Sequence, residues 1–344
     1  MRVLIVRLRA IGDVIHGVPV ACALKDQIPG AFVAWLAEDW ASEVLVGHPA
    51  IDRLITVRPG WTHSLPQTVR LRRELRDLRI DVVLDLQGAR GSVLAASMAG
   101  ASRRLGFVGM VSHQARRVIP NEDTQRVLSR LIAGVLGFEL VKAHADHIVD
   151  RYLEILAPLG LAAPQVRFGF PESEDDVPAV AGAFAGAFAV INPGGSEWKM
   201  WPADRFATVA SYLGSVHALA TVVLQGRREW EQEAARDIVA GSGGPARLAA
   251  PMSLRQLGAL ARKSRVFISG DTGPLHLAAA VGAPCIGLIG HALANRFGPY
   301  GARNITLQGE PVPTYQARRS RLGADAMKAI GVEDVCRACD RMLL

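Results

Sequence analysis

The sequence predicts an α/β protein made of two doubly wound domains, each a parallel sheet flanked by helices. The chain has 344 residues, which exceeds one ordinary core and fits two domains of about 150 residues each. Short apolar runs alternate with segments of helical periodicity, the pattern of parallel strands joined by helices. The alternation stops within residues 162–186 and then begins again. Two successive domains of the same class are therefore expected.

In the first half, the expected strands are short runs rich in valine, leucine and isoleucine. They cover residues 2–6, 31–37, 51–57, 81–88 and 103–108. The expected helices have apolar residues three and four positions apart, as one helix face requires. They cover residues 13–29, 39–49, 67–79, 123–137 and 145–160. These elements predict an N-terminal Rossmann-like domain over residues 1–161.

Residues 162–186 contain prolines, a run of acidic residues and a stretch of glycine and alanine, which predicts a linker. Beyond it, strands are expected at residues 187–194, 218–226, 266–270, 284–290 and 304–309. Helices are expected at residues 202–214, 229–241 and 253–264, and after the turn at 271–273. We therefore predict a C-terminal Rossmann-like domain over residues 187–313 and a helical tail over residues 314–344.

The composition indicates an anionic partner. The formal net charge is +7, the pI is 9.6, and the excess is mostly arginine. No RNP-like, zinc-finger or helix-turn-helix signature accompanies this charge, so nucleic acid is not the expected partner. No apolar run reaches the roughly 18 residues of a membrane span, and the first residues lack the long apolar core of a signal peptide. We expect a cytoplasmic protein without a transmembrane segment.

The four cysteines give no sign of a metal site. Cys336 and Cys339 form a CxxC pair near the C-terminus, but no second pair completes a zinc site. No metal ligands are therefore assigned.

The first informative loop, residues 7–13, follows the first strand. Gly12 permits a tight turn, and Asp13 falls at the start of the next helix. Asp13 has two interpretations: it is the N-cap of that helix, or it is a general base facing a cleft, with His16 one turn further on. His16 could equally be a surface or core histidine.

The second loop is "NPGGSEWKMWP", residues 192–202. Its exposed glycine amides can hold an anion, Ser196 can donate to a phosphate, and Lys199 supplies a positive charge. The alternative is that the two tryptophans beside Lys199 anchor the loop by packing and that Lys199 is only solvated.

Two further loops follow strands in the second half. Glu229 lies in the first turn of a helix, where it could accept hydrogen bonds from ribose hydroxyls or simply favour the helix N-terminus. The other loop, Asp271–Gly273, opens a helix that contains His276. The amides of this helix start attract phosphate, and Thr272 adds a hydroxyl. The charge of Asp271 repels phosphate, so it better suits sugar hydroxyls or bracing of the loop.

Together these loops resemble the ADP-heptose:lipopolysaccharide heptosyltransferases of glycosyltransferase family 9, and heptosyltransferase I in particular. The matching motifs follow the family's order and spacing across essentially the whole chain: "GDVIHGVP" (12–19), "NPGGSEWKMWP" (192–202), "QGRREWE" (225–231) and "SGDTGPLHLAAAVGAPCIGLIG" (269–290). The second motif departs from the threonine-bearing form typical of heptosyltransferase I.

The resemblance implies a GT-B fold, in which two Rossmann-like domains face an interdomain cleft. It implies an inverting, metal-independent transferase that uses no cofactor and moves heptose from ADP-L-glycero-D-manno-heptose to the inner core of lipopolysaccharide. By position, Asp13 resembles the catalytic base. The residues that resemble the donor site are Ser196, Lys199, Glu229, Asp271, Thr272, Gly273 and His276.

The acceptor side is expected in the N-terminal half. Gly12, His16, Arg116 and Arg117 are candidates to contact a phosphorylated, Kdo-lipid A type acceptor at the inner membrane surface. A second group of arginines lies at positions 70, 72, 73, 76 and 79, where a merely solvated helix face is the alternative.

Other functions remain open at this point. A related transferase could act on a protein or a secondary glycan. The same fold could also host a nucleotide-sugar epimerase or hydrolase, or a nucleotide-sugar-binding protein without turnover.

Overall fold

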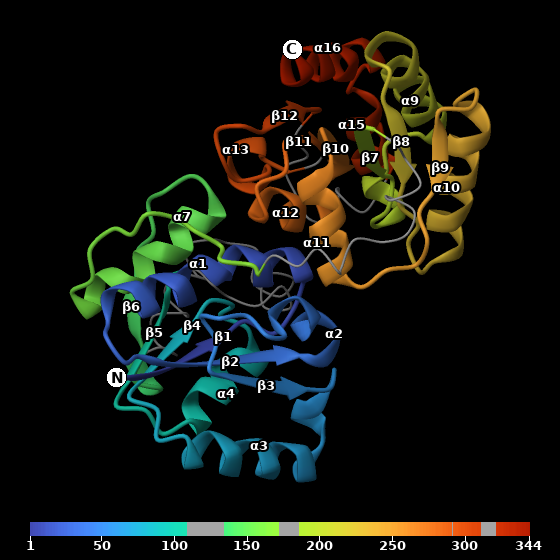
Figure 1. The fold of residues 1–344 in the computed structure, drawn as a ribbon. Helices are drawn as coiled ribbons and strands as arrows, with labels where there is room; N and C mark the ends of the chain where they lie inside the picture. Colours follow the sequence, from blue (N-terminus) through green and yellow to red (C-terminus); the bar gives the residue numbers. More distant parts are fainter. Residues whose placement is uncertain (109–133, 172–185, 291, 311–320) are drawn as a thin grey trace. The chain divides into compact units, whose positions relative to one another are not determined.

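The computed structural model describes residues 1–108, 134–171, 186–290, 292–310 and 321–344. The chain divides into two compact units, Met1–Pro171 and Glu172–Leu344. Their boundary falls inside the predicted linker. Each unit is an α/β fold with its own six-stranded parallel sheet, as the alternation of strands and helices predicts (Figure 1).

The sheet of the first unit has the strand order β3-β2-β1-β4-β5-β6. Its strands are β1 (Arg2–Val6), β2 (Phe32–Glu38), β3 (Arg53–Val57), β4 (Val82–Asp85), β5 (Arg103–Phe107) and β6 (Glu139–Val141). Because the order reverses beside β1, the loops after β1 and β4 meet at the switch point of the sheet, where doubly wound folds bind ligands.

Helices cover both faces of this sheet (Figure 1). They are α1 (Ile11–Gln27), α2 (Asp39–Ser42), α3 (Leu65–Asp77), α4 (Arg90–Met98) and α7 (Ile148–Leu153). α3 and α4 pack on one face, where Leu71, Leu75 and Ala95 join a core with strand residues such as Leu4 and Val83. α1 packs on the other face, where a Cβ at Gly17 would lie 2.9 Å from the Trp35 ring.

The second unit repeats the plan, with the strand order β12-β11-β10-β7-β8-β9. Its strands are β7 (Phe188–Asn192), β8 (Ala220–Val223), β9 (Ala246–Leu248), β10 (Val266–Gly270), β11 (Cys285–Ile289) and β12 (Ile305–Gln308). Here the order reverses between β7 and β10, so the loops after these two strands are neighbours.

The helices of the second unit also lie on both faces of their sheet. They are α9 (Ala203–His217), α10 (Glu229–Gly241), α11 (Leu254–Lys263), α12 (Gly273–Ala280), α13 (Ala294–Phe297), α15 (Arg321–Lys328) and α16 (Val332–Leu343). The predicted helical tail is not a separate body, because Val335, Ala338 and Cys339 of α16 join the core that α9 and α10 form on the sheet.

Several predicted elements differ from the structure. Residues 39–49 form only the short α2 and a 3-10 turn at Glu43–Leu45, and residues 145–160 form α7 followed by a 3-10 segment at Glu154–Leu159. Pro158 lies in that segment and cannot supply the amide that an α-helix needs there. Neither α4 nor the three-residue β6 is among the elements predicted from the sequence. The helix expected at 123–137 lies mostly outside the described residues.

No helix in the described ranges is both long and apolar enough to cross a membrane.

Candidate functional site

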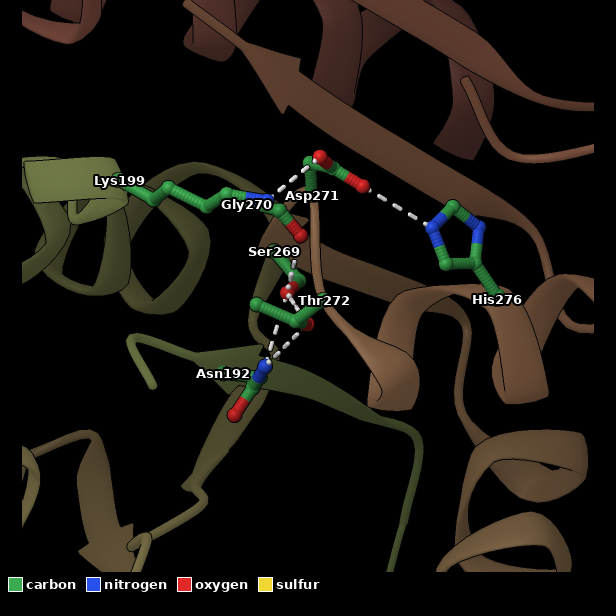
Figure 2. A network of polar contacts seen from close by, with 7 residues as sticks. All are labelled: Asn192, Lys199, Ser269, Gly270, Asp271, Thr272 and His276. Carbon is green, nitrogen blue, oxygen red and sulfur yellow. Dashed lines mark hydrogen bonds and ion pairs between the residues drawn. The ribbon is translucent and has the colours of Figure 1, made fainter. Parts of the chain in front are cut away.

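Two clusters of polar side chains lie at carboxyl ends of central strands, one in each unit. The cluster of the second unit begins with the pairing of β7 and β10, whose register sets Asn192 opposite Ser269. The Asn192 amide Nδ2 donates to Ser269 Oγ at 2.8 Å and lies 3.0 Å from Thr272 Oγ1 (Figure 2). The two hydroxyls are themselves 3.0 Å apart. This network holds the turn between β10 and α12.

The same network leaves the start of α12 without a side-chain cap. Thr272 is the N-cap residue, but its side chain makes no capping hydrogen bond. Gly273 and Pro274 form the first turn, and Pro has no amide hydrogen to satisfy. A helix start of this kind is an anion site in principle, since its amides and dipole favour negative charge. The Thr272 hydroxyl, which the sequence predicts to contact phosphate, instead makes hydrogen bonds with Asn192 and Ser269 in this structure.

Asp271 lies between two side chains, Lys199 and His276, and contacts both. Its Oδ2 lies 3.0 Å from Lys199 Nζ, and its Oδ1 lies 3.1 Å from His276 Nε2 (Figure 2). The side chains of Lys199 and Asp271 are 24% and 15% exposed, so the pair is reachable from solvent but partly desolvated. Lys199 therefore is not merely solvated, and Asp271 has a positive neighbour that offsets its charge.

Packing also fixes the loop that carries Lys199. Trp201 is buried against Phe206 with its ring edge-to-face, and its Nε1 donates to the carbonyl of Ile330 at 3.0 Å. Trp198 lies under Lys199, whose Nζ is 5.3 Å from the ring centroid. The two tryptophans have different roles: Trp201 anchors the loop, and Trp198 supports the cation.

A glutamate that the sequence did not single out shapes the same loop. Glu231 Oε1 accepts the Gly195 amide at 2.8 Å, and Oε2 accepts the Arg228 amide at 3.1 Å. Gly195 has φ +139°, and a Cβ there would lie 3.0 Å from Thr272 Cγ2, so the turn needs glycine. Ser196 follows as the N-cap of a 3-10 turn, Glu197–Lys199, and its carbonyl accepts the Lys199 amide at 2.7 Å.

Glu229, the predicted ribose contact, lies two residues earlier at the first position of α10 and is exposed. The structure therefore brings Glu231, and not Glu229, against the loop of Ser196 and Lys199. Glu231 is the third residue of α10 and accepts the amide of the N-cap residue, Arg228, but the sequence lacks the Ser or Thr at the N-cap that marks a capping box.

The cluster of the first unit forms where β1 meets α1. Asp13 Oδ2 makes an ion pair with Arg7 Nη2. Burial opposes the charge of the Arg7 guanidinium, but Asp13, Tyr152 and Asp85 together raise the pKa of Arg7 above its ordinary value. Arg7 thus stays a fixed cation beside Asp13, whose side chain is 30% exposed.

The N-cap interpretation of Asp13 is wrong. Ala10, with φ +63°, is the N-cap of α1, and Asp13 lies in the first helical turn, one residue after Gly12. Its side chain makes its ion pair with the preceding loop instead of capping the helix. The carboxylate is thus held by a cation, with solvent access.

The remaining acceptor-side candidates divide. His16 is 3% exposed and packs edge-to-face on His147, with ring centroids 5.9 Å apart, so it is a core histidine in this unit. Arg116 and Arg117 lie outside the described residues.

Asp85 at the end of β4 is a further buried carboxylate beside this cluster. Its oxygens accept hydrogen bonds from the amides of Gln87 and Gly88 and from the Ser92 hydroxyl. Burial raises the pKa of Asp85, against these hydrogen bonds and the charge of Arg7. The Ser92 hydroxyl also accepts the Ala89 amide, so Asp85 fastens α4 to the sheet.

A groove of about 600 Å³ lies on the edge strand β3 and beside α3. Arg53, Arg58 and Arg70 line it together with Asp39 and Glu74. Arg70 belongs to the second group of arginines expected on the acceptor side, whereas the candidates for the donor site do not line this groove.

The CxxC pair, Cys336 and Cys339, lies on α16. Burial raises the pKa of Cys336, and it raises that of Cys339 to about 12, so both thiols resist forming the thiolate that metals bind. No group of three or more His, Cys, Asp or Glu side chains suited to a metal occurs among the described residues.

Comparisons with known proteins agree on one family. The model of glycosyltransferase family 9 (heptosyltransferase) matches residues 68–322. Lipopolysaccharide heptosyltransferase 1 of Pseudomonas aeruginosa is 28% identical over 89% of this chain and 83% of its own length. Lipopolysaccharide heptosyltransferase 1 of Escherichia coli K12 is 26% identical over 89% and 92%.

Solved structures show the same fold. A glycosyltransferase family 9 protein from Veillonella parvula has a TM-score of 0.78 at 22% identity, covering 99% of this chain and 97% of that one. Escherichia coli heptosyltransferase WaaC, solved with ADP, has a TM-score of 0.75 at 21% identity, covering 99% and 100%. The GT-B fold implied by the sequence resemblance is confirmed. A UDP-GlcNAc 2-epimerase from Methanocaldococcus jannaschii has a TM-score of 0.54 at 15% identity over 100% of this chain and 93% of that one. This weaker likeness concerns the fold alone.

Proposed function

Because this chain belongs to glycosyltransferase family 9, the heptosyltransferase family, it is a glycosyltransferase, and we propose its donor, acceptor and mechanism. The donor is ADP-L-glycero-D-manno-heptose. The acceptor is the Kdo-lipid A type inner core of lipopolysaccharide. The observation that carries the proposal is the cluster of Lys199, Asp271 and the uncapped start of α12 in the second unit.

Lys199 and the α12 amides are suited to the donor's diphosphate. A nucleoside diphosphate leaves with negative charge, which must be stabilised as the bond to the sugar breaks. Lys199 supplies a mobile cation, and the amides of Gly273 and the following turn supply fixed dipoles. These groups can stabilise the charge of the leaving diphosphate without a metal ion. We therefore propose a metal-independent reaction that uses no cofactor.

Asp271 is suited to the sugar. Its carboxylate is held between Lys199 and His276, which fixes its direction. A carboxylate accepts hydrogen bonds from hydroxyls, whereas it repels phosphate. We assign Asp271 to heptose hydroxyls, Ser196 to the diphosphate and, as the sequence resemblance suggests, Glu229 to the ribose.

Asp13 is suited to the acceptor hydroxyl. In the proposed step, the acceptor oxygen forms a bond to the anomeric carbon of heptose, and the bond from that carbon to the diphosphate oxygen breaks. Asp13 takes the hydroxyl proton, and ADP leaves with the electron pair. Attack opposite to the leaving group inverts the anomeric configuration. Arg7 orients the carboxylate through its contact with Oδ2.

The proposed place of action is the cytoplasmic face of the membrane, where a lipid-linked acceptor is reached from the aqueous side. A transferase that uses another acceptor, a protein or a secondary glycan, would share the donor site and differ only on the acceptor side.

The deciding experiment presents the purified full chain with ADP-heptose and Kdo-lipid A and measures ADP release and the mass of the glycolipid. Parallel reactions contain UDP- or GDP-sugars, a chelator, or no acceptor. We expect acceptor-dependent ADP release that the chelator leaves unchanged, and a product of inverted anomeric configuration. A preference for UDP or GDP would overturn the assigned donor. ADP release without any acceptor would indicate a hydrolase.

A further inference from the structure

The outward face of α3 has an unusual composition for a solvent-exposed helix. Leu65, Val69, Arg72 and Arg76 recur at intervals of four, three and four residues, which places them on one face. Leu71 and Leu75 occupy the opposite side and are buried in the core of the first unit. We call the side chains of Leu65, Val69, Arg72, Arg73 and Arg76 the α3 face.

The apolar end of the α3 face is open to solvent. Leu65 is 75% exposed and Val69 is 40% exposed, although both belong to residue types that favour burial. Leu94 of the neighbouring α4 is 39% exposed. Figure 1 shows α3 and α4 together on one side of the first sheet. Leu65 and Val69 lie one turn apart on α3, and an exposed apolar pair of this kind favours contact with another apolar surface.

The other end of the α3 face carries unneutralised positive charge. Arg72 and Arg73 are exposed, and neither has an ion-pair partner in the part of the chain that the structure describes. The nearest acidic residues on the helix are Glu74, which pairs with Arg53, and Asp77. Arg58 and Arg70, which line the neighbouring groove, add to the positive charge.

Arg76 has a structural task in addition. Its Nε donates to the carbonyl of Met98 at 3.1 Å, and its guanidinium lies where a Cβ at Gly100 would be, 2.7 Å away. Arg76 therefore fastens α3 to the end of α4, whereas Arg72 and Arg73 have no such contact. Their charge is available to a partner.

We propose that the α3 face docks on an anionic lipid surface. Leucine and valine enter the boundary between headgroups and acyl chains, and the arginines contact the phosphates, as in interfacial amphipathic helices. Exposed apolar and basic side chains on one helix face fit the boundary between acyl chains and phosphate headgroups. An acidic protein or a nucleic acid as the partner would leave both sets of vesicles unbound in the test below. A lipid-linked acceptor gives the docking its purpose, and to that extent the inference rests on the proposed function.

The test measures how the full chain partitions onto sedimented vesicles, without donor or acceptor. One set of vesicles is phosphatidylcholine alone, and the other contains about one third phosphatidylglycerol. We expect binding to the anionic vesicles that decreases as salt rises. The variant R72E/R73E should reduce the partition coefficient at least about tenfold, since each arginine near the surface contributes substantially. L65S/V69S should reduce it by a similar factor through lost apolar burial.

Matched controls come from the second unit. Arg236 and Arg247 are exposed there, and R236E/R247E makes the same charge change; Val216 is 57% exposed, and V216S removes a comparable apolar side chain. Both controls should bind as the wild type does. If circular dichroism shows that R72E/R73E does not fold, the milder variant R72Q/R73Q, which removes the charge without reversing it, takes its place.

Three results would overturn the inference: no binding of the wild type to anionic vesicles, unchanged binding of the α3 variants, or an equal loss in the controls. Transfer to a water-soluble, lipid-free acceptor separates this inference from the proposed function. A lower transfer rate of R72E/R73E with this acceptor would assign the two arginines to the acceptor instead of the bilayer. If the wild type shows no transfer, the proposed function fails, while the vesicle result still decides the docking.

Discussion

Lys199 Nζ lies 3.0 Å from Asp271 Oδ2, and this ion pair joins the loop after β7 to the loop after β10. The two loops are 72 residues apart in the chain and meet because β7 and β10 are neighbours in the sheet. The pair explains how an anionic side chain can lie at a site suited to phosphate: Lys199 and His276 surround it. The effects of substituting Lys199 and Asp271 on the binding of ADP and of ADP-heptose can therefore be compared.

Replacing Lys199 with alanine should lower kcat/KM for the donor by about a hundredfold or more, because the leaving diphosphate loses its mobile cation. The fall should also appear as weaker binding of ADP alone. Steady-state kinetics and calorimetry measure the two effects. Lys263 is an exposed lysine at the end of α11, and K263A is the matched control. Unchanged ADP affinity in K199A would contradict the assignment to the diphosphate.

Asp271→Asn should separate the sugar from the phosphates. The variant removes a charge that repels the diphosphate and weakens an acceptor for sugar hydroxyls. We expect the KM for ADP-heptose to rise while the affinity for ADP stays equal or increases. Equal losses for ADP and for ADP-heptose would argue instead that Asp271 serves only to hold Lys199 and the loop.

Asp13→Asn should lower turnover by about a hundredfold to ten-thousandfold, the usual range for loss of a general base. ADP affinity should not change, because Asp13 is assigned to the acceptor. The measurement is acceptor-dependent ADP release, with the folded state checked by thermal unfolding. Asp237 is exposed on α10, and D237N should behave as the wild type. Near wild-type turnover in a folded D13N would refute the base.

Glu231 and Glu229 form a natural matched pair. Glu231→Ala should destabilise the protein by about 1–2 kcal/mol and weaken donor binding, because the Gly195 and Arg228 amides lose their acceptor. Glu229→Ala should leave the free energy of unfolding unchanged and raise the KM for the ADP-heptose donor, because the ribose loses its assigned hydrogen-bond acceptor. Denaturant unfolding and donor kinetics distinguish them. If E229A has no kinetic effect, the ribose assignment is wrong.

The stability contributed by the contact of α16 with α9 should depend on pH. Hydrogen bonds from Tyr212 and His217 lower the pKa of Asp340 below the ordinary 3.8. A carboxyl whose pKa is lowered on folding stabilises the folded state above its ordinary pKa, and this contribution is lost as the pH falls through the lowered value. Wild type should therefore melt higher than D340N near neutral pH, and the gap should close below about pH 4. A gap in Tm that is constant with pH would contradict this linkage.

Much of the fold followed from local sequence. Runs such as residues 2–6 and 266–270 are apolar throughout because strands of a covered parallel sheet are buried on both faces. The polar residues that follow such runs necessarily fall at the carboxyl edge, which is why Asp13, Lys199 and Asp271 were predicted correctly to lie at strand ends. α4 was missed because residues 90–98 are mostly small and show no clear apolar stripe.

What local sequence could not determine was which loops meet. The register of β7 with β10 pairs Asn192 with Ser269, and that pairing turns the Thr272 hydroxyl toward the loop. The choice of Glu231 over Glu229 depends on the direction of the first turn of α10 relative to Gly195. The ion pair of Arg7 with Asp13 arises because the chain reverses at Ala10. The sequence by itself determined the two sheets and the residue types at their edges, since burial and periodicity are local properties. Only the tertiary structure decided the partners of these side chains. Strand order brings together residues that are far apart in the chain, and their separation in the sequence does not predict that they meet.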